Sequence, residues 1–329
     1  MNILVTGATG FIGSKLCLTL AESGHTVHAL CRDTKHPLLP RHNKIKPFKG
    51  DLLNKQNIAD ALRNCSQVYH TAALAKMWVP DKDEFFRVNV MGTQNVLEAA
   101  MQAGVEKVVH TSTCGVWGPT VKHPIAEEDP RITGFAIDYE RTKYLAELEA
   151  QLYYKKGLQV VIVNPSRVYG EGPVTESNTV GKMIVAYLKG KWHINPANGL
   201  QVSNYAYLGD VVKGHIAAME KGVAGNRYIL GGEDISFNSF FNHLKYISGK
   251  DHKLFKVPQK LIKLYSRLEQ FKTAATGIPP FFLPAFADRL KYDQKYSSNK
   301  AVQQLGYSIT PFAAGFAKTV EHLKHCIHA

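Results

Sequence analysis

A glycine-rich turn near the start of the chain, TGATGFIG at residues 6–13, limits the folds that this sequence can adopt. An apolar strand candidate precedes the turn, and a helix candidate begins near its end. Glycines are needed there because the turn is tight, its backbone approaches a ligand closely, and the helix NH groups then face the ligand's negative charge. The motif predicts a pyrophosphate site; the alternative is a structural turn without a ligand. The cofactor-binding residues predicted in this turn are Gly7, Gly10, Phe11, Ile12 and Gly13.

Short β-rich runs alternate with helix-length amphipathic segments through the first half of the chain. The strand candidates are residues 3–6, 26–31, 44–48, 67–71, 107–113 and 159–164. Two intervening segments, residues 84–103 and 138–156, carry apolar residues at helical spacing and are predicted crossover helices. Such alternation is typical of βαβ units, so the sequence predicts an α/β Rossmann fold with a doubly wound parallel sheet.

The second half of the 329-residue chain is organised differently, and the length allows one large or two coupled domains. After Pro165 the segments are punctuated by glycine and proline, with a helix candidate at 180–189 and strand candidates at 201–208 and 227–230. We therefore predict a smaller, interleaved C-terminal substrate lobe. The predicted division assigns residues 1–165 and about 198–225 to the dinucleotide-binding Rossmann domain, and about 166–197 and 226–329 to the substrate-binding lobe.

The end of the second strand candidate discriminates between two cofactors. An acidic residue there binds the ribose hydroxyls of NAD, whereas a basic residue accommodates the 2′-phosphate of NADP. Here Arg32 comes first, with Lys35 and Arg41 nearby, which favours NADP(H). NAD(H) stays open as the alternative, because Asp33 follows directly and would serve the ribose.

Four residues follow the next two strand candidates. Asp51 and Leu52 come after the third, and Ala72 and Ala73 come after the fourth. The carboxyl ends of parallel strands share one edge of the sheet, where a dinucleotide binds. We therefore predict that these residues contact the cofactor; the alternative for each is an ordinary turn residue.

Tyr139 and Lys143 are separated by four positions on a predicted helix, so they lie on one face. A lysine ammonium beside a phenol favours the phenolate, which allows a tyrosine with an ordinary pKa of about 10 to exchange protons near neutral pH. The same spacing occurs in Tyr187/Lys191, Tyr246/Lys250 and Tyr296/Lys300. Position favours Tyr139, because its helix lies in the dinucleotide half and follows the strand that ends near Thr113.

Together these features resemble the extended short-chain dehydrogenase/reductase superfamily over most of the chain. The matching stretches are TGATGFIG at 6–13, DLLN at 51–54, HTAA at 70–73, VNVMGT at 88–93, HTSTCGVWG at 110–118, YERTK at 139–143 and NPSRVYG at 164–170. The resemblance implies that Tyr139 is the catalytic acid and base, and that Lys143 lowers its pKa and holds the nicotinamide ribose. It further implies that Thr113 hydrogen-bonds the substrate oxygen and that Asn89 and Pro165 line the cofactor cleft.

Three positions bear on the branch of the superfamily. Nucleotide-sugar epimerases and dehydratases typically carry an Arg that clamps the substrate diphosphate, and Ser203 stands in its place. Sugar dehydratases also share an Asp-Glu pair after the catalytic Thr, where this chain has Cys114 and Gly115. The stretches TVHALCRD, NPSRVYG and RYILGGE are instead similar to dihydroflavonol reductases, 3β-hydroxysteroid dehydrogenases and hopanoid-associated reductase-like proteins.

That branch implies an NADP(H)-dependent oxidoreductase that reduces a carbonyl, or oxidises the alcohol, of a hydrophobic small molecule. A set of apolar residues would offer such a substrate stacking surface. The set is Met77, Trp78, Phe85, Phe86 and Trp117. Each of these residues would otherwise be an ordinary core or rim side chain. The alternative function is an NAD-dependent nucleotide-sugar epimerase or dehydratase.

Net charge and cysteine usage limit the expected binding partners and the expected cellular location. Lys and Arg number 40 against 27 Asp and Glu, a net charge of +13 that suits phosphorylated ligands, nucleic acid or anionic membranes. Because no nucleic-acid-binding motif is present, we expect no nucleic-acid partner. Five scattered cysteines without a CxxC pair, and 14 histidines without an HExxH motif, predict no metal site and a cytoplasmic location.

The sequence leaves open whether the protein contacts membranes and whether it forms oligomers. No apolar run approaches the roughly 20 residues of a transmembrane helix, so we expect none. A basic segment at 253–272 beside an apolar stretch at 278–286 is interpreted either as a peripheral membrane contact or as a solvated helix. The helices near 85–103 and 138–156 resemble those that form the family's dimer bundle, so a homodimer and a monomer both stay open.

Overall fold

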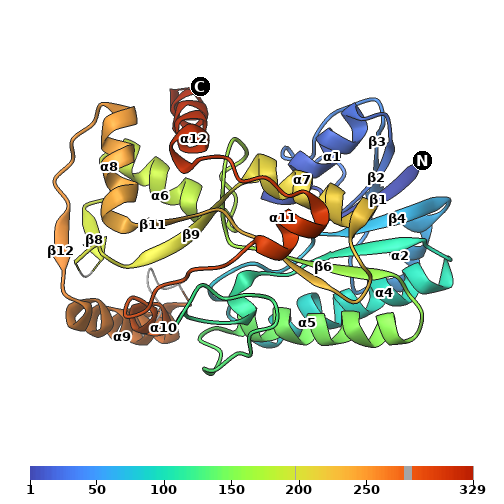
Figure 1. Cartoon of the computed structure of the whole chain (residues 1–329), viewed down its shortest axis with the longest axis horizontal. Helices are drawn as coiled ribbons and strands as arrows, with labels where there is room; N and C mark the ends of the chain where they lie inside the picture. Colours follow the sequence, from blue (N-terminus) through green and yellow to red (C-terminus); the bar gives the residue numbers. More distant parts are fainter. Residues whose placement is uncertain (197, 278–283, 329) are drawn as a thin grey trace.

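The computed structural model describes residues 1–196, 198–277 and 284–328, and its larger part is built on a seven-stranded parallel sheet (Figure 1). The strands in spatial order are β3 (Ile45–Lys49), β2 (Thr26–Cys31), β1 (Asn2–Thr6), β4 (Cys65–His70), β5 (Lys107–Thr111), β6 (Val160–Pro165) and β10 (Arg227–Leu230). Successive strands run outward from β1 on both sides, so the strand order reverses between β1 and β4. Doubly wound sheets bind ligands at the carboxyl edge beside this reversal. The predicted α/β Rossmann fold is confirmed.

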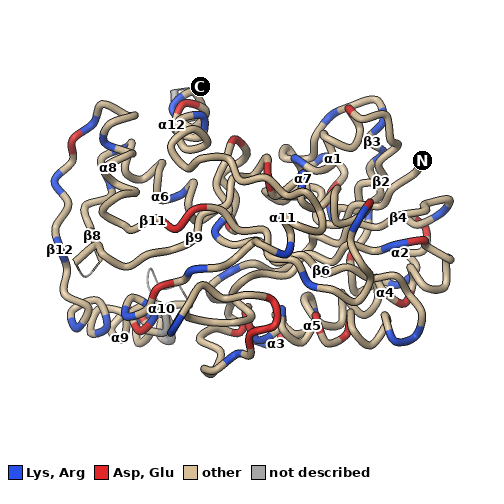
Figure 2. Tube along the Cα trace, in the orientation of Figure 1, with Lys and Arg blue, Asp and Glu red and all other residues tan. Residues whose placement is uncertain are grey.

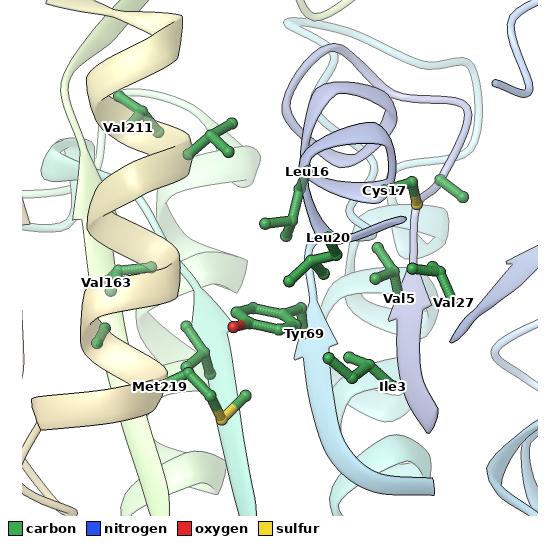
Figure 3. Packing of buried hydrophobic residues seen from close by; sticks show 14 of the residues in the cluster. Ile3, Val5, Leu16, Cys17, Leu20, Val27, Tyr69, Val163, Val211 and Met219 are labelled. Atoms are coloured by element: carbon green, nitrogen blue, oxygen red, sulfur yellow. The ribbon is translucent and has the colours of Figure 1, made fainter. Parts of the chain in front are cut away.

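Helices cover both faces of the sheet (Figure 1). One face carries α1 (Phe11–Glu22), α7 (Leu208–Lys221) and α11 (Asn299–Leu305); the other carries α2 (Lys55–Leu62), α4 (Gly92–Gln102) and α5 (Asp138–Lys155). A hydrophobic core lies on each face of the sheet, and alternate residues of β1 contribute to the two cores. Ile3 and Val5 pack on the first face, and Leu4 packs on the second. Figure 3 shows Tyr69 of β4 between α1 and α7, among the side chains of the first core.

The smaller lobe lies at the other end of the molecule (Figure 1). Its strands are β7 (Arg167–Tyr169), β9 (Val202–Tyr207) and β11 (Glu233–Ser236) in one sheet, and β8 (Ile194–Pro196) and β12 (Phe255–Val257) in another. Its helices are α6 (Thr179–Leu188), α8 (Phe237–Ser248), α9 (Gln259–Thr276), α10 (Pro284–Arg289) and α12 (Phe312–His328). Aromatic side chains dominate its core, with the rings of Phe240 and Phe316 4.8 Å apart and those of Phe312 and Phe316 4.7 Å apart.

Two strands lie in a different part of the molecule from the one predicted for them. Residues 226–329 are predicted to belong to the substrate lobe, but β10 pairs in parallel with β6 in the large sheet. Its last three residues are fully buried, and α7 supplies the crossover that leads to it. Conversely, β9 lies within the range 198–225 predicted for the Rossmann domain, yet it pairs with β7 and β11 in the lobe.

The basic segment at 253–272 forms β12 and most of α9. The apolar stretch at 278–286 falls mainly outside the described residues, which omit 278–283. Among the helices of the described residues, none is both long and apolar enough to cross a membrane.

Candidate active site

The glycine turn joins β1 to α1 at the carboxyl edge of the large sheet. Gly7 has a φ of +75°, and the Gly10 NH donates to the Gly7 carbonyl oxygen over 2.9 Å. A Cβ atom on Gly13 would collide with the same carbonyl, so α1 packs this closely only because Gly13 has no side chain.

The start of α1 fits an anionic ligand. Gly10 caps the helix without a side-chain hydrogen bond, and the first turn carries no acidic residue. A Cβ atom on Gly10 would meet only the Gly7 oxygen, at 3.1 Å, among the atoms described around it. The first NH groups of a helix have no partner within the helix. The NH groups of Phe11, Ile12 and Gly13 and the space that Gly10 leaves open before them fit the pyrophosphate of a dinucleotide, which these four residues would hold.

Arg32 lies exposed directly after β2. Within the ranges that the structure describes, no acidic side chain is within ion-pair distance of its guanidinium. The neighbouring Asp33 carboxylate instead accepts a hydrogen bond from the Lys35 NH over 2.9 Å, which closes its own turn. Arg32 is therefore the residue at this strand end whose charge is available to a ligand.

The loops after β3 and β4 are anchored at the same edge of the sheet. The Asp51 carboxylate accepts a hydrogen bond from the Leu53 NH over 2.8 Å, and the Leu52 carbonyl accepts one from Asn95 of α4 over 2.9 Å. The Ala72 NH donates to the Thr6 hydroxyl over 3.3 Å, and Ala73 follows it, partly buried. The same edge of the sheet as the glycine turn thus carries four predicted cofactor residues, namely Asp51, Leu52, Ala72 and Ala73.

Asn89 lies in a π-helical turn, η1 (Arg87–Met91), between α3 (Asp83–Phe86) and α4. Its Oδ1 accepts a hydrogen bond from the Leu74 NH over 2.7 Å, and its Nδ2 donates to the Thr142 hydroxyl over 3.0 Å. π-helical turns interrupt the regular helix and occur frequently at functional sites. Asn89 therefore connects the loop after β4 to α5, which carries the predicted catalytic residues.

Tyr139, near the start of α5, lies beside Thr113, which precedes the short helix η2 (Cys114–Val116). The Thr113 side chain interacts with the phenol, and its hydroxyl accepts a hydrogen bond from the Gly115 NH over 3.1 Å. Burial raises the pKa of Tyr139 to about 12, although the interaction with Thr113 acts in the opposite direction. The phenol is thus protonated near neutral pH and is able to donate.

Lys143 is 1 % exposed, and its Nζ lies 3.4 Å from His110 Nε2. Burial lowers the pKa of Lys143 to about 8, against the effect of the Glu147 carboxylate. In this structure burial dominates the pKa of Tyr139, and the Lys143 ammonium is directed to His110. That Lys143 lowers the pKa of Tyr139 stays a prediction.

Glu147 and His110 are partners of Lys143 that the sequence analysis did not identify. Glu147 is buried and accepts a hydrogen bond from Asn164 Nδ2 over 2.6 Å, and its Oε2 lies 3.6 Å from Arg227 Nη1. Burial raises the pKa of Glu147 and lowers that of His110 well below its usual range, so His110 is neutral and able to accept from the ammonium. Glu147 continues the four-residue spacing of Tyr139 and Lys143, which is the signal that would have found it.

A second buried carboxylate stands directly beside Tyr139. Glu140 is 1 % exposed. Arg131 Nη2 lies 3.5 Å from Glu140 Oε2, and Arg289 at the end of α10 also pairs with this carboxylate. Arg131 further donates to the Gly115 and Val116 carbonyl oxygens over 2.8 and 2.9 Å. These contacts tie the start of α5 both to the loop after β5 and to the smaller lobe.

The predicted apolar set beside the site is divided by the structure. Phe85 and Trp117 are each 2 % exposed and belong to the core, with the Arg227 guanidinium 4.8 Å above the Trp117 ring. The idea that both offer surface to a substrate is therefore corrected. Met77 and Phe86 are exposed, and Trp78 is partly buried.

The other tyrosine–lysine pairs lie in different surroundings. Tyr187 is in the aromatic core of the lobe, Tyr246 is almost fully exposed, and Tyr296 donates to the Gly118 carbonyl oxygen over 3.2 Å. Lys191 and Lys250 are exposed, and Lys300 forms an ion pair with Glu128 over 3.1 Å. Among the four pairs, Lys143 is thus the buried lysine without an ion pair to a surface carboxylate.

The positions that bear on substrate class are also placed by the fold. Ser203 is buried in β9, opposite Ile235 of β11. Cys114 is buried, and its thiol donates a hydrogen bond to the Asn164 carbonyl oxygen over 3.1 Å inside the protein. Pro165 ends β6 in register with Leu230 of β10 and is buried, at the same edge of the sheet as the glycine turn.

The doubly wound sheet with its glycine turn, together with the family and the relatives that match the chain, identifies the protein as an NAD(P)-dependent enzyme of the extended short-chain dehydrogenase/reductase type. Residues 3–231 match the NAD dependent epimerase/dehydratase family. The chain belongs to this family.

Known proteins of the superfamily are similar over nearly the whole chain. A protein named as a dihydroflavonol 4-reductase in Synechocystis sp. is 32 % identical, with 92 % of this chain and 88 % of that protein covered. Sterol demethylase protein B of Methylococcus capsulatus is 30 % identical, with 97 % of each covered. The crystal structure of Thermus thermophilus UDP-glucose 4-epimerase in complex with NAD has a TM-score of 0.79 and 27 % identity, with 98 % of this chain and 99 % of that chain covered.

Proposed function

We propose that this protein is an NADP(H)-dependent oxidoreductase that reduces a carbonyl, or oxidises the corresponding alcohol, of a hydrophobic small molecule. The observation that carries the proposal is the placement of the Tyr139 phenol beside Thr113 and one helical turn from the buried Lys143. This group lies at the sheet edge where the glycine turn fits a dinucleotide.

A bound nicotinamide would supply the hydride that adds to the carbonyl carbon. Tyr139 donates its proton to the carbonyl oxygen, and Thr113 hydrogen-bonds the same oxygen as it gains charge. The Lys143 ammonium favours the phenolate that remains. His110 and Glu147 are positioning residues, because they act on the reaction through the location and charge of Lys143.

Two observations favour a hydrophobic substrate over a nucleotide sugar. Ser203 is buried where an epimerase would carry its diphosphate-binding Arg, and a hydroxyl does not replace a bidentate guanidinium. The two relatives named above as a dihydroflavonol 4-reductase and a sterol demethylase protein match the chain nearly end to end.

The second candidate is an NAD-dependent nucleotide-sugar epimerase or dehydratase. It is favoured by the likeness to the Thermus thermophilus epimerase over almost all of both chains. The two functions differ in what happens to the cofactor, because an epimerase regenerates the cofactor that it holds. Oxidation of added NADPH over a panel of flat aromatic, steroidal and aliphatic ketones supports the reductase. Release of stoichiometric NAD from the denatured protein, without such oxidation, supports the epimerase.

The proposed role of Lys143 predicts a pH dependence. The pKa of Lys143 is lowered to about 8, so its ammonium is present below that pH and is lost as the pH rises through it. We expect kcat/KM for the carbonyl to fall above about pH 8, whereas Tyr139, with its pKa near 12, does not titrate there. Because Glu147 raises the pKa of Lys143, Glu147→Gln should move the fall to lower pH. Glu149→Gln, on the same helix, is the matched control, and an equal movement in it would contradict the role of Glu147.

Arg32 is proposed to bind the 2′-phosphate of NADP(H). Arg32→Ser removes the charge at an exposed position, so the fold should be unaffected. We expect the ratio of kcat/KM for NADPH over NADH to fall by about 10- to 100-fold, since a charge-assisted contact to a phosphate contributes roughly 1.5–3 kcal/mol. Arg63→Ser, at an exposed position directly after α2, should leave the ratio unchanged. An unchanged ratio in Arg32→Ser would instead favour Asp33 and NAD(H).

A further inference from the structure

Most large apolar side chains of helix α9 (Gln259–Thr276) lie on the face away from the protein. A helix that packs on a protein core usually has them on the face toward the protein. The face toward the protein carries Ile262, Ser266 and Thr273, which are at most 7 % exposed. The outward face carries large apolar side chains that are between 47 and 76 % exposed, namely Leu261, Leu264, Tyr265, Leu268 and Phe271. Their spacing of three and four residues forms one continuous stripe along the helix. We call these five residues the α9 stripe.

The charges that accompany the α9 stripe are cationic. Lys260, Arg267 and Lys272 are exposed on α9, and Lys253 and Lys256 are exposed on the segment just before it. Figure 2 shows blue positions along α9 and along the chain that leads to it from β12. The acidic residue of the helix, Glu269, is turned inward with 12 % of its side chain exposed, and Lys272 lies 3.5 Å from it. The outward surface of α9 therefore combines apolar side chains with positive charge.

We propose that α9 binds the surface of a bilayer containing anionic lipids. A helix in that position buries its apolar stripe at the boundary of the acyl chains, while lysine and arginine reach the phosphate groups. The flanking cations supply the charge complementarity. A second copy of the chain is a poorer occupant, because two copies joined through α9 would bring these cations face to face, in a protein whose net charge is already +13.

The position of α9 connects this surface with the active site. Lys263 forms an ion pair with Asp288 of α10 over 2.7 Å, and Gln259 Nε2 donates to the Ala287 carbonyl oxygen over 2.7 Å. The next residue of α10 after Asp288 is Arg289, which pairs with Glu140 beside Tyr139. One short helix thus separates the proposed bilayer contact from the catalytic tyrosine.

Vesicle co-sedimentation of the full-length protein tests the proposal. We expect binding to vesicles of mixed phosphatidylglycerol and phosphatidylcholine, little binding to phosphatidylcholine alone, and weaker binding at high salt. Leu264→Gln/Leu268→Gln should lower the partition coefficient by about tenfold or more. The matched control is Leu148→Gln/Leu152→Gln, which changes two leucines of similar exposure on α5 and should bind as the unchanged protein does. Phe271→Ser is the second variant if the double substitution impairs folding.

Three results would overturn the proposal. One is the absence of vesicle binding at low salt by the folded protein. Another is equal binding to vesicles with and without the anionic lipid. The third is a dimer, measured by light scattering after size exclusion, that the α9 substitutions dissociate while vesicle binding stays unchanged, because a second copy then covers the stripe.

Discussion

Replacing Tyr139 with Phe is expected to lower kcat for carbonyl reduction by about 10²- to 10⁴-fold, the range for loss of a general acid. The substitution removes one oxygen, so the ring still fills its place on α5. The glycine turn that fits the dinucleotide is untouched, and the Kd for NADPH should stay nearly unchanged. Single-turnover oxidation of NADPH and a separate fluorescence titration of the cofactor measure the two quantities independently.

Tyr154→Phe is the matched control for this substitution. Tyr154 lies on the same helix, more exposed and at its far end, so its loss should leave both kcat and NADPH binding unchanged. Turnover in Tyr139→Phe that stays close to that of the unchanged protein would remove Tyr139 from the mechanism. A parallel loss of NADPH binding would show a structural effect instead of loss of the proton donor.

Glu140→Gln is expected to lower the free energy of unfolding by about 3 kcal/mol, because removing one member of a buried ion pair leaves the other charge uncompensated. Both Arg131 and Arg289 would lose their partner, with 11 and 22 % of their side chains exposed. The amide keeps the size of the carboxylate, so packing against Gly115 is retained. Equilibrium denaturation in urea measures the loss.

Glu128→Gln is the matched control for Glu140. Glu128 pairs with Lys300 over 3.1 Å but is 72 % exposed, and an exposed ion pair contributes about 0–1 kcal/mol. A loss in Glu140→Gln no larger than that in Glu128→Gln would contradict the central place given to this carboxylate. It would show that solvent screens both arginines in the folded protein.

Local pattern was sufficient for the large sheet and for the glycine turn. All seven strands of the sheet are found within a few residues of strand candidates, because most parallel strands are buried on both faces and form apolar runs. The edge strand β3 is mostly exposed instead, and lysines interrupt its apolar residues. The spacing of Tyr139 and Lys143 placed both on one helix face for the same kind of reason: a helix repeats every 3.6 residues. The functional roles of the predicted site residues stay predictions until they are tested by substitution.

Features that depend on distant partners could not be predicted in this way. Glu140 is next to Tyr139, but its partner Arg289 is far along the chain, and no local pattern relates the two. Phe85 and Trp117 are buried by side chains from other parts of the chain, and their residue type alone does not indicate that burial. The basic segment at 253–272 is interpreted from the sequence either as a membrane contact or as a solvated helix, and most of it forms α9. Sequence periodicity does not say whether an apolar stripe faces the core or the solvent.

Transfer of deuterium from added NADPH labelled at C4 of the nicotinamide tests the proposed function most directly. With an accepted ketone, we expect mass spectrometry to find the label on the carbinol carbon of the product over many turnovers, and to find transfer in Tyr139→Phe slowed by about 10²- to 10⁴-fold. Protein that transfers no label to any ketone, releases tightly bound NAD on denaturation and interconverts nucleotide sugars would contradict the proposal and establish the epimerase instead.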